Sequence, residues 1–169
     1  NMKEIILIKN GELTLKGLNR SNFEDILIKN IRRRLRSLGE FDVRKAQSTI
    51  YIEPKSENFD FEEALERVKL IFGIAAFSRA CVCEKSMEDI LSKSAEYLKD
   101  SLSKIKTFKV EAKRSDKQFP LTSPEICREV GGKLLETNSH LKVDVHNPDL
   151  VVYVEIRDYY AYVRAEQIH

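Results

Sequence analysis

The residues best suited to chemistry lie in one basic stretch, KRSDKQFPLTSPEI, at positions 113–126. An alternating apolar run precedes this stretch and an amphipathic run follows it, so we expect a loop between a strand and a helix. Cations in such a loop can neutralise phosphates, and an arginine can hold one phosphate through two parallel hydrogen bonds. The cations here are Lys113, Arg114 and Lys117.

The end of the stretch adds an aromatic ring and a helix start. Phe119, held before Pro120, offers a face on which an unpaired base can stack, which contributes about 1 to 3 kcal/mol. Ser123 as the N-cap and Pro124 at the first helical position begin a helix whose free amides favour an anion. Two hypotheses follow. Either the loop binds RNA, or Phe119 fills the core between the two domains and Ser123 merely caps the helix.

The helix after this loop carries two adjacent glycines, Gly131 and Gly132, near its middle, where glycine is a poor helix former. The missing side chains would let either an RNA strand or the sheet approach closely. A second basic group lies at residues 29–36 (KNIRRRLR), with cations at i, i+3, i+4 and i+7 that share one helix stripe. These cations are Lys29, Arg32, Arg33 and Arg36. The stripe is either a second candidate RNA contact or a solvated helix face.

The three cysteines are interpreted as structural thiols. Cys81 and Cys83 share one face of a predicted strand, and Cys127 lies on the apolar side of a helix. Neither the cysteines nor the three histidines have the spacing of a zinc site. The common nucleotide-binding and hydrolytic motifs are also missing from the sequence. We therefore predict no metal site, no cofactor and no catalytic residue within these 169 residues.

Composition bounds the class of protein. The formal net charge of +2 does not by itself indicate a class of binding partner. The longest apolar run, at residues 70–77, is far shorter than the roughly 20 residues of a membrane span. An odd, small number of cysteines is typical of reduced thiols. A cytoplasmic protein with no membrane contact is expected.

The elements that position these residues fall into two groups, so the predicted fold class is α+β. Residues 1–83 show the order β-α-β-β-α-β, with helix stops at Gly39 and Gly73, which is the ferredoxin-like arrangement. Residues 84–169 alternate helices and strands and predict a second α/β domain. No linker separates the two domains, so we expect them to pack directly against each other. A family profile could start the second domain near residue 59.

Four stretches resemble the N-terminal region of ThiI-type tRNA sulfurtransferases. They are KNGELTLKGLNRSNFE (9–24), AKRSDKQFPLTSPEICREVGGKLLE (112–136), HNPDLVVYVEIRD (146–158) and AYVRAEQ (161–167). The first resembles the ferredoxin-like domain of that family, and the other three resemble a THUMP domain. One departure is Asn10, where the family usually has an aromatic residue.

The resemblance implies that this chain binds the acceptor stem and 3' end of tRNA. A PP-loop domain, absent from this chain, would use ATP to make 4-thiouridine, and the full enzyme would also supply sulfur for thiamine biosynthesis. A sulfur-donor protein and a homodimer are further implied partners. The RNA-binding residues implied by the matched THUMP positions are Lys113, Arg114, Lys117, Phe119, Pro120, Ser123, Arg128 and Lys133, with close approach at Gly131 and Gly132.

Two alternatives stay open. The THUMP-like unit could serve another tRNA-modifying enzyme, a methyltransferase or a pseudouridine synthase, although the GELTLKG stretch argues against that. The chain could also be a protein-interaction module without RNA contact, in which the basic loop is a solvated turn.

Overall fold

The computed structural model of the chain describes residues 2–9, 20–46, 49–72 and 77–168. The chain divides into two compact units, residues 4–79 and residues 80–169 together with the first three. We call these the N-terminal unit and the C-terminal unit, and describe each by itself. The GELTLKG stretch, Asn10, the predicted turn at 47–48 and the predicted stop at Gly73 lie outside the described residues. Direct packing of the two domains stays a prediction.

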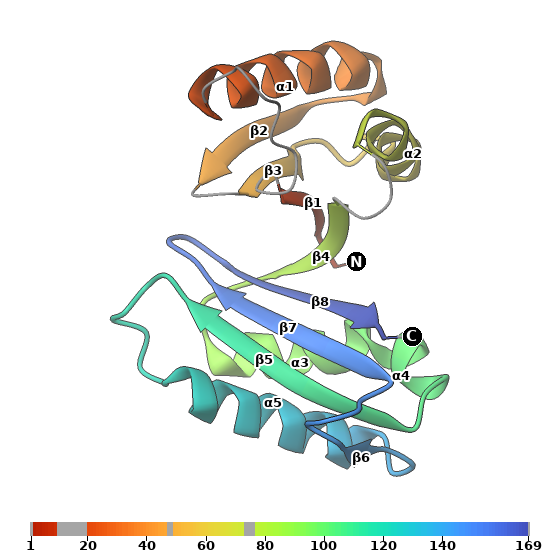
Figure 1. Cartoon of the computed structure of the whole chain (residues 1–169), viewed down its shortest axis with the longest axis vertical. Helices are drawn as coiled ribbons and strands as arrows, with labels where there is room; N and C mark the ends of the chain where they lie inside the picture. Colours follow the sequence, from red (N-terminus) through yellow and green to blue (C-terminus); the bar gives the residue numbers. More distant parts are fainter. Residues whose placement is uncertain (1, 10–19, 47–48, 73–76, 169) are drawn as a thin grey trace. The chain divides into compact units, whose positions relative to one another are not determined.

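The N-terminal unit has the predicted β-α-β-β-α-β order (Figure 1). Its strands pair antiparallel in the order β2-β3-β1, and β4 runs on into the C-terminal unit. The elements are β1 (Glu4–Lys9), α1 (Arg20–Leu35), the short 3-10 helix η2 (Arg36–Leu38), β2 (Phe41–Ala46), β3 (Thr49–Pro54), α2 (Phe61–Phe72) and β4 (Phe77–Cys83).

One side of this sheet is covered by both helices. Alternate strand residues point to the same face, and here they meet the apolar stripes of α1 and α2 in one buried cluster. Its members include Ile6, Ile8, Leu27, Ile31, Leu35, Val43, Ile50, Ile52, Ala64 and Val68. Gly39 ends η2 with φ of 129°, and a Cβ there would lie 2.8 Å from the Cα of Phe59. The predicted helix stop at Gly39 is therefore confirmed, because only glycine fits this backbone.

The C-terminal unit places two long helices against one face of a mixed sheet (Figure 1). The strand order is β4-β8-β7-β5-β6, with β5 parallel to both β7 and β6 and the remaining pairs antiparallel. The elements are α3 (Met87–Tyr97), α4 (Lys99–Ser103), β5 (Thr107–Arg114), α5 (Ser123–Thr137), β6 (Lys142–Val143), β7 (Leu150–Ile156) and β8 (Ala161–Gln167).

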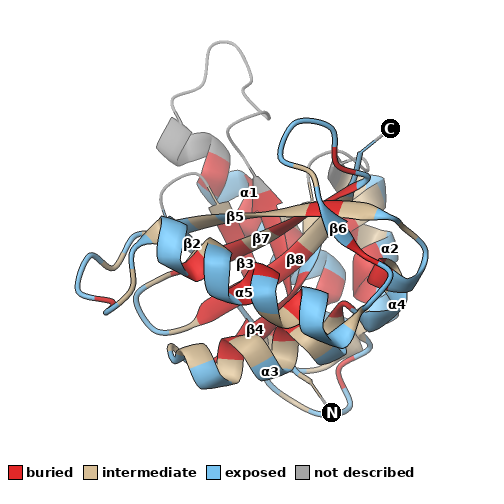
Figure 2. Cartoon of the chain, turned by 90° about the horizontal axis from the view of Figure 1, so that it is seen from below, coloured by how far each residue is buried: buried red, intermediate tan, exposed pale blue. Residues whose placement is uncertain are grey.

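The core of the C-terminal unit lies between this sheet and the helices α3 and α5. It includes Cys81, Cys83, Ile90, Phe108, Ile126, Val130, Leu134, Val152, Val154 and Val163. Figure 2 shows the buried and exposed sides of α5 in separate colours. The predicted α+β class is thus confirmed.

No helix among the described residues is long and apolar enough to cross a membrane.

Candidate nucleic-acid interface

The basic loop, residues 115–122, leaves the sheet where β5 and β7 end side by side. The backbone N–H and the hydroxyl of Ser115 both donate to the carbonyl oxygen of Ile156, at 2.9 and 3.2 Å. The carboxylate of Asp116 accepts the backbone N–H of Gln118 at 2.9 Å. These bonds hold the start of the loop against the end of β7.

Lys85, which lies in the connection between β4 and α3, joins this loop to the turn between β7 and β8. Its ammonium forms an ion pair with Asp116 and donates to the carbonyl oxygen of Asp158, at 2.9 Å, in the turn between β7 and β8. The hydrogen bond from Lys85, followed by that from the amide of Gln118, holds the pKa of Asp116 below its usual value. No local pattern in the sequence indicates this pair, because its two members lie 31 residues apart.

The prediction that Phe119 stacks on a base is wrong for this conformation. Its side chain is only 6% exposed and belongs to the core cluster with Ile126 and Val130. The guanidinium of Arg114 donates to the carbonyl oxygen of Phe119 at 3.1 Å, which fixes the backbone at this point. Phe119 therefore fills the core of the C-terminal unit, and RNA binding by the loop stays a prediction that rests on its cations. Arg114 has this structural contact besides any role toward phosphates.

The helix after the loop is capped by Thr122, not by Ser123. The N–H of Glu125 donates to the hydroxyl of Thr122 at 3.3 Å, and the N–H of Thr122 donates to the carboxylate of Glu125 at 2.9 Å. These bonds from Thr122 hold the pKa of Glu125 below its usual value. Ser123 is the first residue of α5. The T-x-x-E pattern of this capping box is visible in the sequence, and the predicted N-cap at Ser123 is wrong by one residue.

Three predicted cations, one at the end of β5, one in the basic loop and one in α5, have no side-chain hydrogen bond or ion pair within the described residues. Lys113, Lys117 and Arg128 are exposed, and none forms a hydrogen bond or ion pair within the described parts of the chain. Pro120 is also exposed. Glu125 attracts Arg128 without forming an ion pair with it. Because all three cations are exposed and form no ion pair, they are available to phosphates. They form the part of the predicted site that the structure leaves open to a ligand, and we call them the loop cations.

The two glycines of α5 have different surroundings. Gly131 is buried, and a Cβ there would reach Val110 of β5 at 4.0 Å, so this glycine faces the sheet and not RNA. Gly132 is exposed, and a Cβ there would meet nothing within 4 Å. It lies four residues after Arg128 and therefore on the same helix face. Of the two predicted close approaches, the structure leaves room for a ligand at Gly132 only.

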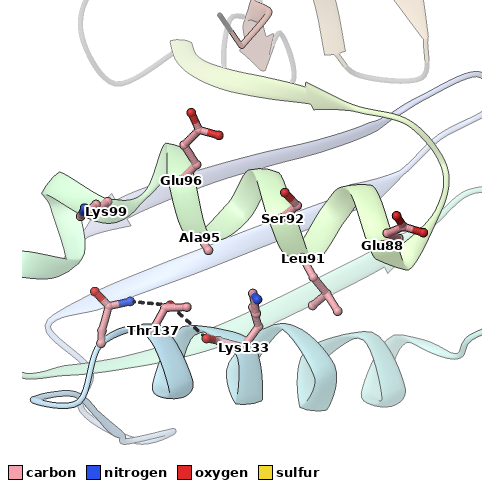
Figure 3. Close-up of a pocket in the computed structure, with 9 residues that line it drawn as sticks. Glu88, Leu91, Ser92, Ala95, Glu96, Lys99, Lys133 and Thr137 are labelled. Carbon is pink, nitrogen blue, oxygen red and sulfur yellow. Dashed lines mark hydrogen bonds between the residues drawn. The ribbon is translucent and has the colours of Figure 1, made fainter.

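Lys133 lies apart from the basic loop itself. It lines a groove of about 630 Å³ between α3 and α5, where its side chain lies near Leu91 and Ser92 of α3 (Figure 3). Ten residues separate it from Ser123, which is about 15 Å along the helix axis. The structure therefore does not bring Lys133 together with the loop.

The cations of α1 form an exposed stripe in the N-terminal unit. Leu27, Ile31 and Leu35 are buried on the opposite side, as predicted. Arg33 donates to the side chain of Asn30 at 3.0 Å. The others, Lys29, Arg32 and Arg36, are exposed and have no internal partner within the described residues. The shallow pockets beside them also contain Asp25, Glu40 and Asp42, so carboxylates share this surface.

The cysteines are free thiols, with Cys81 and Cys83 buried and Cys127 partly buried. The hydrogen bond with Cys81, and then burial, raise the pKa of Cys83, and burial raises the pKa of Cys127. Such thiols stay protonated and are poor nucleophiles. Among the described residues, no three side chains of the metal-binding types gather into a possible site.

Comparisons with known proteins identify two domains in this chain. The ThiI ferredoxin-like domain matches residues 5–78, and the THUMP domain matches residues 84–165. A probable tRNA sulfurtransferase from Acetivibrio thermocellus is 46% identical over 169 residues. That match covers 99% of this chain but 43% of the relative, so the chain spans less than half the length of this relative.

Two solved structures are similar over the whole chain. A crystal structure of a 4-thiouridine synthetase in complex with RNA and ATP has a TM-score of 0.79 and 31% identity, and covers 99% of this chain and 42% of that one. A protein from Pyrococcus horikoshii has a TM-score of 0.75 and 30% identity, and covers 99% of this chain and 55% of that one. Both likenesses include the unit that carries the loop cations.

Proposed function

The chain belongs to the ThiI family, with that family's ferredoxin-like domain followed by a THUMP domain, and on this premise we propose that it is the tRNA-binding part of a tRNA sulfurtransferase. The full enzyme makes 4-thiouridine in tRNA and supplies sulfur for thiamine biosynthesis, in the cytoplasm. ATP is used by a domain outside this chain, and a sulfur-donor protein and a homodimer are further partners of this proposal. The role of the residues described here is to hold the acceptor end of the tRNA.

The observation that carries the proposal is the set of exposed loop cations in the basic loop and the two elements that flank it, none of which forms an ion pair within the described residues. They are Lys113, Lys117 and Arg128. Phosphates of an RNA backbone supply the matching charge, and each contact releases counterions, so the affinity depends steeply on salt. The relative of known structure that was crystallised with RNA supports the same class of ligand. Because Phe119 is buried, the site relies on phosphate contacts and not on an aromatic stacking platform.

The proposal is tested by exchanging Lys113 and Lys117 together for glutamine and measuring binding to an acceptor-stem hairpin over a range of salt concentrations. Loss of both contacts should lower the slope of log affinity against log salt by about 2. A matched control exchanges Lys69 and Lys93, which already pair with Glu66 and Asp89. An equal loss in both variants would show that only net charge matters, and unchanged binding in the folded loop variant would remove the loop from the interface.

The 3' end is tested separately, with hairpins that carry or lack the unpaired nucleotides. Tighter binding of the tailed hairpin is expected, because the tail adds phosphates within reach of the loop cations. Equal affinities would mean that this chain contacts the paired stem alone. A THUMP-containing methyltransferase or pseudouridine synthase is the weaker alternative, because the first domain matches the ThiI ferredoxin-like family.

A further inference from the structure

A second basic site lies in the C-terminal unit, at the opposite end of β5 from the loop cations. A pocket of about 640 Å³ opens where α4 ends, β5 begins and the chain enters β6. None of the seven described residues that line it is acidic. They are Ser103, Lys104, Ile105, Lys106, Thr107, His140 and Lys142. Residues 104–117 form a basic block in the sequence, and its first two lysines, Lys104 and Lys106, lie outside the basic loop.

The backbone holds these lysines close together. The N–H of Lys142 donates to the carbonyl oxygen of Lys106 at 3.0 Å, and Lys142 pairs with Thr107 in the parallel ladder of β5 and β6. Lys104 lies two residues before Lys106, at the end of α4. All three lysines are exposed and have no side-chain partner among the residues that the structure describes. Three cations near one another repel each other, and a bound polyanion would relieve that repulsion.

Neighbouring groups are already engaged elsewhere. The carboxylate of Asp149 accepts the amides of Lys106 and Thr107, at 3.0 and 3.1 Å, and is thus used to fix the start of β5. His140 donates from Nε2 to the carbonyl oxygen of Leu102 at 3.0 Å, because a carbonyl can only accept. These bonds shape the pocket. Asp149 also attracts Lys106, and the three lysine side chains remain exposed.

We propose that Lys104, Lys106 and Lys142 form a second contact for the phosphate backbone of RNA. This inference rests on the proposed function and extends it, since β5 runs from Thr107 at this pocket to Arg114 at the loop. Seven residue steps along a strand span about 23 Å. Phosphates separated by that distance belong to an extended duplex, so the stem of a hairpin contacts both ends of the domain. A trinucleotide is too short to do so.

The test exchanges Lys104, Lys106 and Lys142 together for glutamine and measures the binding of a long hairpin and of a trinucleotide. The slope of log affinity against log salt should fall by about 3 for the hairpin, and trinucleotide binding should be unchanged. Thermal unfolding of the same variant shows that the domain is intact, which matters because a cation after a helix also interacts with the helix dipole.

Three outcomes separate this inference from the proposed function. Unchanged hairpin binding, with a normal loss in the Lys113 and Lys117 double variant, would overturn the second contact and leave the proposed function in place. An equal loss for hairpin and trinucleotide would also overturn it, because that result reflects the general field of the protein. If neither variant affects hairpin binding, the proposed function itself fails.

Discussion

Exchange of Gly132 for alanine should make the protein more stable. The residue is exposed in the middle of α5, ten residues into a helix of 15. A Cβ there would meet nothing within 4 Å, so the substitution causes no steric clash. Alanine favours a helix interior over glycine by about 1 kcal/mol, and the full gain is expected because no contact opposes it. The free energy of unfolding should therefore rise by about 1 kcal/mol.

Urea denaturation followed by circular dichroism measures this gain as a higher midpoint with an unchanged m-value. Gly131→Ala is the matched comparison, because its Cβ would make an ordinary contact with Val110 at 4.0 Å and gain the same helix preference. If Gly132→Ala were less stable than the parent, the description of this position as an open helical site would be wrong.

Substitutions at Gly132 should weaken RNA binding, although they raise the stability of the protein. Gly132→Gln adds a longer uncharged side chain on the face that carries Arg128. If an RNA strand lies against this face, binding should weaken for glutamine more than for alanine, while both variants stay at least as stable as the parent. Unchanged RNA affinity in both variants would show that the glycine has no role in RNA approach.

Three further predictions concern stability. Phe119→Ala should lower the free energy of unfolding by about 3 to 5 kcal/mol, because the ring is in the core; a loss below about 1 kcal/mol in urea denaturation would contradict that placement. Gly39→Ala should cost more than about 1 kcal/mol, since its φ is 129° and a Cβ would lie 2.8 Å from Phe59; full stability in thermal unfolding would disprove this strain. Lys85 lowers the pKa of Asp116 in the folded protein. The ion pair therefore contributes its full stabilisation above the ordinary aspartate pKa of about 4, and this stabilisation is lost as the pH falls through the lower pKa of the folded state. Asp116→Asn should therefore show a smaller loss of stability on acidification, and identical acid profiles would refute the ion pair.

The sequence predicted the elements of the fold because their signals are local. Leu27, Ile31 and Leu35 recur at helical spacing, and all three are buried on one side of α1. Phe108, Val110 and Ala112 alternate along β5 and pack on the helical face of the sheet. Such periodic patterns show which face of an element meets the core. Burial of that apolar face also stabilises the element, so the pattern predicts the element.

The site was predicted less well because its details depend on contacts between distant residues. Whether Phe119 faces RNA or the core is decided by packing against α5, and the ion pair of Lys85 with Asp116 joins separate connections. One error was avoidable. Ile126, Val130 and Leu134 define the buried side of α5, and their helical phase already places Gly131 near that side and Gly132 away from it.

If the chain binds RNA as proposed, Lys85 has a consequence for the kinetics of that binding. Its ammonium is used inside the protein, with Asp116 and the carbonyl oxygen of Asp158, so it adds order to the basic loop and little attraction for phosphates. A loop that is already ordered does not have to fold during the encounter, so the association should show only a small change in heat capacity. The on-rate is then governed by long-range attraction between the exposed cations and the RNA, and it should fall as ionic strength rises.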